Sequence, residues 1–378
     1  MKTSREVSDN LMRGKTAERI GFMDLPWIET LKKWVGQGYP TDEEGEPVDA
    51  ATYFDFDMAG PVGWFAWGTE VPVEVIEETE EWKIIRYYSG AILKWWKNDK
   101  TSTPQHIDFL MTSRKVWEKD YKPHVIGAGR KWVTDKFIAN TKKELEKRRE
   151  QNRWSYGGGV FIWEQARRDF GDVRLYESLL LDPDWIHDYC RTYTDLYKEC
   201  YTILFEEAGK PDGVWIYEDL GYKNSLFCSP ATYDKLIFPY FREIVEFLHS
   251  YDLPVVLHTC GFTEPLLDVI VDIGFDALNP MEVKAGNDPL RIAEKYGDKL
   301  ALIGGLDARV LESGDRNLIR MAVTNLLDGM KDRGARYFFA SDHSISTNVR
   351  LTDFEYAIDV YRANMMYSEK EGETLQRK

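Results

Sequence analysis

From about residue 211 onward, short apolar runs that end in polar residues alternate with amphipathic stretches of helical period. We predict strands in five apolar runs, at 213–217, 254–258, 276–279, 300–304 and 336–340. We predict helices in the stretches between them, at 229–251, 263–273, 289–296 and 316–332. Repeated βα units build a parallel sheet that helices cover. The pattern therefore predicts the α/β class and a (β/α)8 barrel, the TIM barrel.

The first part of the chain follows a different pattern. Strand-like alternation at 73–78 and 82–88 flanks an acidic turn, which predicts a β-hairpin. Residues 137–151 are rich in Lys, Glu and Arg and predict a solvated helix. We expect a single structural domain overall. In it, residues 1–150 form the N-terminal part of the barrel with hairpin and helical insertions, and residues 151–378 form the remainder and carry the metal site.

Composition disfavours several classes of protein. The chain has 378 residues, of which 43% are hydrophobic and 14% aromatic, so it can bury a large core. Its net charge of −15 disfavours nucleic acid or an anionic membrane as a partner. No stretch approaches the roughly 18 consecutive apolar residues of a membrane span, and the N-terminus lacks the apolar core of a signal peptide. With four scattered cysteines, which predict reduced thiols, we expect a cytoplasmic protein.

Polar side chains gather where the predicted strands end. In a (β/α)8 barrel the C-terminal ends of the strands share one mouth, where the chemistry takes place. The residues that follow the apolar runs are, in chain order, Glu218, Asp219, His258, Cys260, Glu282, Asp307, Asp342 and His343. We therefore expect two histidines, one cysteine and several carboxylates to converge on one face of the barrel.

The pair His258 and Cys260 closes the apolar run 254–258. Residues two apart on a strand point to the same side, so both side chains can reach one ion. We predict a four-coordinate Zn²⁺ site made of His258, Cys260, Glu282 and His343. Nitrogen, sulfur and oxygen ligands together suit zinc better than Mg²⁺ or Ca²⁺.

The other strand-end carboxylates have less definite roles. Asp342 or Asp307 is an alternative to Glu282 as the oxygen ligand, and a carboxylate outside the ligand shell can fix a histidine tautomer. We take four acidic residues as candidates for catalysis, namely Glu218, Asp219, Asp307 and Asp342.

Several motifs around these residues carry a family resemblance. They are Tyr217-Glu-Asp-Leu-Gly-Tyr222, Phe227-Cys-Ser-Pro230, Phe238-Pro-Tyr240, Val255-Val-Leu-His-Thr-Cys-Gly261, Asp276-Ala-Leu-Asn-Pro280, Gly304-Gly-Leu-Asp307 and Ser341-Asp-His343. Together they resemble the uroporphyrinogen decarboxylase superfamily, and more closely its methyltransferase-like branch. The resemblance continues more faintly at 27–31 and 103–105, so it spans nearly the whole chain.

The resemblance implies one of two chemistries. The superfamily contains porphyrinogen decarboxylases, which need no cofactor, and zinc methyltransferases, which move methyl groups between corrinoid proteins and thiols or other acceptors. Nothing near 22–27 matches the arginine-rich N-terminal motif of the decarboxylases, whereas His258 and Cys260 match the His-x-Cys of the methyltransferases. The methyltransferases usually place a cysteine near the end of the last strand, where this chain has Ser341-Asp342-His343. His343 lines up instead with a histidine common to the decarboxylases.

We therefore expect a zinc-dependent methyltransferase that moves a methyl group between a small-molecule donor or acceptor and a corrinoid (cobalamin). O-demethylation of a methoxylated compound is one such reaction. The corrinoid is expected on a separate partner protein, because residues 1–378 are accounted for by one barrel and its elaborations. Two alternatives stay open, a metal-free carboxy-lyase like uroporphyrinogen decarboxylase and a non-catalytic barrel that binds small molecules. A homodimer is compatible with each of them.

Aromatic residues in the N-terminal part have two interpretations. They are Trp64, Phe65, Trp67, Trp95 and Trp96. In the first interpretation they form a lid over an aromatic methoxyl substrate. In the second they serve ordinary packing.

Overall fold

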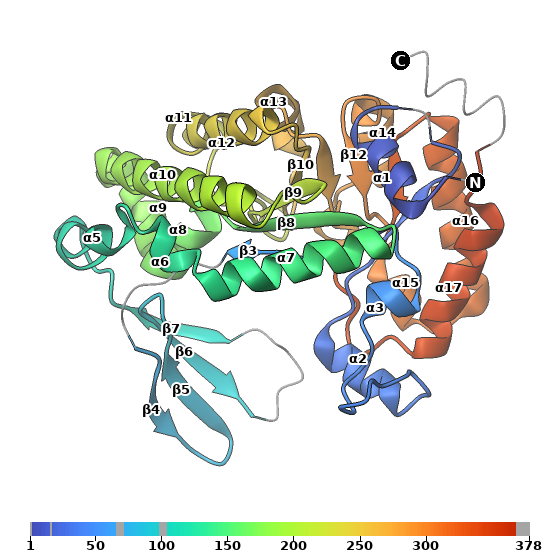
Figure 1. Ribbon diagram of the computed structural model, residues 1–378, viewed down its shortest axis with the longest axis horizontal. Helices are drawn as coiled ribbons and strands as arrows, with labels where there is room; N and C mark the ends of the chain where they lie inside the picture. The colour runs from blue at the N-terminus through green and yellow to red at the C-terminus, as the bar shows by residue number, and fades with distance from the viewer. Residues whose placement is uncertain (1, 16, 66–71, 98–103, 368–378) are drawn as a thin grey trace.

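Parallel strands close into a barrel in the computed structural model, which describes residues 2–15, 17–65, 72–97 and 104–367 (Figure 1). The strands pair in the order β1-β13-β12-β11-β10-β9-β8-β2. Their bounds are β1 (Gly21–Phe22), β2 (Met58–Ala59), β8 (Trp154–Val160), β9 (Gly213–Tyr217), β10 (Val255–His258), β11 (Ala277–Asn279), β12 (Ala301–Ile303) and β13 (Tyr337–Phe339). The first and last strands of this order approach each other, since the amide of Asp57 donates to Phe22 O at 2.7 Å. The predicted α/β barrel is confirmed.

The strands form where the sequence predicts them because both of their faces are covered. Val255, Val256 and Leu257 in β10 are all fully buried, as expected for a parallel strand between helices and a barrel interior. Inside the barrel, Trp215 and Val256 belong to the same packed cluster as Leu11 of α1 (Ser4–Met12). Helix α1 thus contributes to the packing of the barrel interior.

Helices surround the barrel (Figure 1). Up to β9 they are α2 (Ile28–Val35), α3 (Ala50–Tyr53), α4 (Arg114–Val116), the π-helical η1 (Trp117–Tyr121), α5 (Lys122–Val125), α6 (Gly129–Trp132), α7 (Asp135–Glu150), α8 (Ile162–Phe170), α9 (Asp172–Leu181) and α10 (Pro183–Glu207). After β9 they are α11 (Pro230–Leu236), α12 (Phe238–Ser250), η2 (Glu264–Leu266), α13 (Leu267–Ile273), η3 (Val283–Ala285), α14 (Pro289–Tyr296), α15 (Ala308–Glu312), α16 (Arg316–Asp332) and α17 (Leu351–Asn364). None of the described helices combines the length and the hydropathy that crossing a membrane requires.

The predicted helix at 229–251 is two helices. Helix α11 ends at Leu236 and α12 begins at Phe238, immediately before Pro239. Proline has no amide hydrogen to donate to the preceding turn, so a continuous helix would be interrupted there. The periodicity on both sides of the break stays helical, which explains why the sequence pattern alone does not reveal it.

A separate antiparallel sheet projects from the barrel in the N-terminal part of the chain (Figure 1). Its strands, in order, are β4 (Glu74–Glu78), β5 (Trp82–Arg86), β6 (Ala91–Trp96) and β7 (Gln105–Phe109), and a further strand, β3 (Trp64–Phe65), pairs with β8 of the barrel. Strands β4 and β5 form the predicted hairpin. The sheet meets the barrel helices at Gly171, where an added Cβ would lie 2.3 Å from the ring of Phe109.

Candidate functional site

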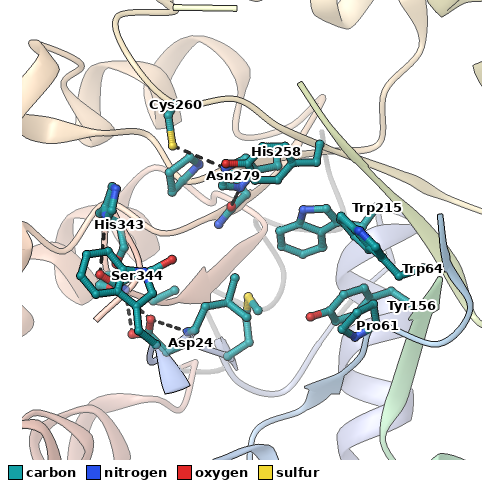
Figure 2. A pocket seen from close by; sticks show the side chains of 17 residues that line it. Asp24, Pro61, Trp64, Tyr156, Trp215, His258, Cys260, Asn279, His343 and Ser344 are labelled. Carbon is teal, nitrogen blue, oxygen red and sulfur yellow. Dashed lines mark hydrogen bonds between the residues drawn. The ribbon is translucent and has the colours of Figure 1, made fainter. Parts of the chain in front are cut away.

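A cavity of about 570 Å³ opens at the C-terminal ends of the barrel strands (Figure 2). Its described lining comes from β1, β2, β3, β8, β9, β10, β11 and β13 or from the loops that follow them. The lining residues are Met23, Asp24, Leu25, Trp27, Pro61, Trp64, Tyr156, Trp215, Tyr217, His258, Cys260, Asn279, Pro280, Ala340, Ser341, His343 and Ser344. The size is typical of a small-molecule site.

Three metal-competent side chains meet at one end of this cavity, and we call them the metal cluster: Asp219, His258 and Cys260. Their ligand atoms all lie within 4.8 Å of one another. His258 Nε2 is 3.4 Å from Cys260 Sγ and 3.7 Å from Asp219 Oδ1. The backbone brings them together because Cys260 N donates to Asp219 Oδ1 at 2.9 Å, which ties the end of β10 to the end of β9.

Asn279 orients the imidazole of His258. The amide nitrogen of Asn279 donates to Ile303 O at 3.2 Å, which turns its oxygen toward His258 Nδ1 at 2.6 Å. His258 Nδ1 must therefore carry the proton and donate it, so the lone pair of Nε2 faces Cys260 and Asp219. The ring also stacks on Tyr217, with centroids 4.3 Å apart and an interplanar angle of 12°. An imidazole held in this way by a second partner is typical of metal-binding histidines.

Burial and negative charge set the protonation of the metal cluster. Burial lowers the pKa of His258 despite the nearby Asp219 carboxylate, which keeps the ring neutral. Burial, followed by the charges of Asp219 and Glu282, raises the pKa of the Cys260 thiol well above its ordinary value. Without a cation the thiol stays protonated. A cation at this position would reverse that preference, because it stabilises the thiolate.

The donor atoms fit zinc. Tetrahedral zinc with a Zn–N distance of about 2.0 Å and a Zn–S distance of about 2.3 Å places the two ligand atoms about 3.5 Å apart. The observed separation between His258 Nε2 and Cys260 Sγ is 3.4 Å. Nitrogen, sulfur and carboxylate oxygen are also the ligands that zinc accepts.

The other two predicted ligands lie close by but outside the metal cluster. Glu282 accepts a hydrogen bond from Gly261 N at 2.6 Å through one oxygen, and its other oxygen is 3.2 Å from Lys284 Nζ. His343 lines the cavity, with Nδ1 3.2 Å from Ser344 O and its ring against the edge of Trp27. Asp219, which we predicted as catalytic, lies where we expected Glu282 or His343. The complete ligand set remains a prediction.

Three of the four predicted catalytic carboxylates make structural contacts outside the cavity. Glu218 is fully buried and accepts the amides of Phe161, Trp163 and Glu164 at the start of α8. Asp342 accepts the amides of Val283 and Ala308, and Asp307 caps α15 and pairs with Arg309 at 2.6 Å. These contacts account for each residue without chemistry, so a catalytic role for any of the three remains a prediction.

Two acidic residues near the site are not among the predicted catalytic or ligand residues. Asp24 lines the cavity and accepts hydrogen bonds from Ser341 N, Ser341 Oγ and Leu25 N, and burial raises its pKa to about 6. Glu164 in the first turn of α8 pairs with Arg167 at 2.5 Å, and burial together with the charge of Asp219 raises its pKa to about 7. Asp24 follows a strand of two residues, too short to show a pattern. Residues 163–164 follow the apolar run 160–162, which predicts a further strand end at the pocket without an assigned role, and the structure places Glu164 in the first turn of α8.

Comparison with known proteins supports the architecture. Residues 170–363 match the model of the family described as Uroporphyrinogen decarboxylase (URO-D). The chain belongs to this family. A solved structure, a methyltransferase from Methanosarcina mazei, is similar to this URO-D family barrel with a TM-score of 0.68, although only 12% of residues are identical; the likeness covers 96% of this chain and 99% of that one. Comparison with curated proteins gives no match. The family resemblance inferred from the sequence is therefore confirmed.

Proposed function

We propose that this URO-D family member is a zinc-dependent methyltransferase that moves a methyl group between a small molecule and a corrinoid on a separate partner protein. The metal cluster carries the proposal, because its nitrogen, sulfur and oxygen atoms lie at separations that suit one zinc ion. The structurally similar protein from Methanosarcina mazei is a methyltransferase, which is consistent with the proposal.

His258 Nε2, Cys260 Sγ and an oxygen of Asp219 would hold the ion. Asn279 keeps the His258 lone pair aimed at it, and the Cys260 amide keeps the Asp219 carboxylate in place. A fourth position would remain for Glu282, for His343 or for the substrate. Zinc at this end of the cavity would supply Lewis-acid chemistry to a thiol or an oxygen of the small molecule.

The corrinoid would approach the open end of the cavity. The described residues form one barrel with a projecting sheet, and the cavity of about 570 Å³ is of a size for a small molecule. A corrinoid carried by a second protein would therefore meet the small molecule at the mouth. O-demethylation of a methoxylated compound is one reaction that this arrangement permits.

The carboxy-lyase alternative has one observation in its favour. Asp24 and His343 line the same cavity, so a carboxyl group and an imidazole are available for proton transfer. A porphyrinogen substrate carries several carboxylates, however, and no lysine or arginine is among the described residues that line the cavity. We therefore place this alternative second.

Metal analysis of protein purified without added metal tests the proposal. We expect about one zinc per chain, lost in Cys260→Ser and retained in Cys228→Ser, a matched control whose cysteine lies outside the cavity lining. Zinc-loaded protein should also transfer methyl groups to or from free cobalamin, which changes the cobalamin absorbance. Zinc-free protein that decarboxylates a porphyrinogen would instead establish the carboxy-lyase.

A further inference from the structure

Aromatic side chains line much of the cavity apart from the metal cluster. Trp64, Tyr156 and Trp215 lie together on one side in Figure 2, and the rings of Tyr156 and Trp215 have centroids 5.0 Å apart. Trp27 and Tyr217 also line the cavity. We call these five residues the aromatic wall. Aromatic faces carry negative electrostatic potential and attract cations, most strongly when water is excluded.

The formal charge of the cavity lining is also negative. Asp24 is the one acidic side chain in the described lining, and it is only 6% exposed. Two further carboxylates lie next to the lining, since Asp219 accepts the amide of Cys260 and Glu282 accepts the amide of Gly261. Lysine and arginine do not occur among the described lining residues. An anionic ligand would find no lysine or arginine to pair with, whereas a cationic ligand would find both Asp24 and aromatic faces.

We propose that the aromatic wall binds the methylated ammonium group of a small organic cation, and that this cation is the methyl-bearing substrate. The second half of this inference rests on the proposed methyl transfer, whereas the binding itself does not. An aromatic methyl ether is the competing ligand, since its ring could stack on the same wall. It would offer no positive charge to Asp24.

The chemistry of the leaving group agrees with a cationic substrate. When Co(I) of the corrinoid partner takes a methyl group from a quaternary ammonium, the C–N bond breaks with both electrons remaining on nitrogen. The cobalt supplies the electron pair of the new Co–C bond and becomes Co(III), and the amine leaves uncharged. No proton donor or cationic side chain is required at the leaving nitrogen, and no lysine or arginine occurs among the described lining residues.

A metal at the other end of the cavity does not oppose this binding. A quaternary nitrogen has no lone pair, so the ion would act on an oxygen of the same molecule rather than on the leaving nitrogen. The Cys260 thiolate and the Asp219 carboxylate together balance the charge of a divalent ion. The negative charge of Asp24, in the lining beyond β1, then remains available to the cation.

Calorimetric titration of the full-length protein with choline and with its neutral isostere 3,3-dimethylbutan-1-ol tests the proposal. The two probes share size and shape and differ in charge, so their ratio isolates the attraction of the wall for a cation. We expect choline to bind about tenfold more tightly. Trp64→Leu should remove most of that preference, because leucine keeps an apolar surface without the aromatic face. Trp96→Leu, on the projecting sheet, is the matched control and should change neither affinity.

Equal affinity for the two probes, or tighter binding of anisole than of choline, would overturn the proposal. If Trp64→Leu fails to fold by circular dichroism, Trp27→Leu provides the same comparison from another strand end. Each titration is run on metal-free and on zinc-loaded protein. Choline selectivity in a protein that binds no zinc would keep the ammonium site and remove the zinc methyltransferase. Zinc binding without choline selectivity would keep the zinc methyltransferase and remove the ammonium site.

Discussion

The two ends of the cavity are built in different ways. At the metal cluster, two of the three side chains are held by hydrogen bonds: Asn279 holds His258, and the Cys260 amide holds Asp219. At the aromatic wall, large rings pack against one another, as Tyr156 and Trp215 do, and shape a largely apolar surface. The difference indicates that one end is suited to bind a small ion in a fixed geometry, and the other to accept a group that can rotate.

The largest expected effect separates Asp219 from the other candidate ligands. Asp219→Asn keeps an oxygen for the Cys260 amide but loses the negative charge, so we expect zinc affinity to fall more than about 100-fold in a chelator competition. Glu282→Gln and His343→Gln are the comparison variants and should cost less, because Glu282 is already engaged by Gly261 and Lys284. If Glu282→Gln or His343→Gln lowered zinc affinity more than Asp219→Asn, the ligand set predicted from the sequence would be supported instead.

The second effect concerns how the metal end is held in place. Asn279→Ala removes the acceptor that fixes the His258 tautomer, and zinc affinity should fall roughly 10- to 100-fold. Ser344→Ala, which also alters a polar residue of the cavity lining, should leave zinc affinity within about twofold. An unchanged affinity in Asn279→Ala would mean that stacking on Tyr217 alone orients the imidazole.

A third prediction tests whether Glu218 has a structural or a catalytic role. Glu218→Gln places an amide where a carboxylate now accepts three backbone N–H groups, so at least one buried donor loses its partner. We expect the free energy of unfolding to fall by about 1–3 kcal/mol, measured by urea denaturation. Zinc and choline affinities of the folded fraction should stay near those of the unaltered protein. Normal stability combined with lost methyl transfer would show that Glu218 is catalytic after all.

A smaller effect belongs to the aromatic end. Trp27→Leu should weaken choline binding about fivefold and leave zinc affinity unchanged, because Trp27 lines the cavity without touching the metal cluster. Calorimetry and chelator competition on the same preparation check both statements. Loss of zinc in this variant would show that the two ends are not independent.

The smallest effect is expected at Asp307. Its carboxylate caps α15 and pairs with Arg309, and asparagine is an equally good N-cap. Asp307→Asn should therefore change zinc affinity, choline affinity and stability very little, by about 0.5 kcal/mol or less in the free energy of unfolding. A large loss of methyl transfer would restore the catalytic role predicted for it.

The sequence predicts the barrel well because its strands are apolar runs that end in polar residues. All five predicted strands after residue 211 are present, shortened by at most one residue at either end, and His258 and Cys260 lie at the mouth as expected. The position of a residue after a strand does not determine which way its side chain turns. Glu218 and Asp219 are neighbours, yet one is bound to α8 and the other joins the metal cluster.

The aromatic residues also show that position in the sequence does not determine where a side chain lies. Of those that we proposed as a lid, Trp64 lines the cavity, Phe65 packs on Phe137 and Tyr201, and Trp95 and Trp96 lie on the projecting sheet. Trp67 lies outside the described residues. Tyr156 and Trp215 were not singled out, because Trp215 lies inside a predicted apolar strand and Tyr156 lies in the glycine-rich part of β8, which the sequence pattern did not predict. The packing of α1 inside the barrel is a long-range contact that no local pattern reveals.

The first turn of α8 contacts the metal cluster. Its amides hold Glu218, and the indole of Trp163 donates to Asp219 O at 2.8 Å. Gly171, which follows the last turn of the same helix, lies against Phe109 of the projecting sheet. One continuous line of contacts therefore joins that sheet to a residue of the metal cluster. A displacement of the sheet, for example by a docking protein, would therefore act on Asp219 through α8.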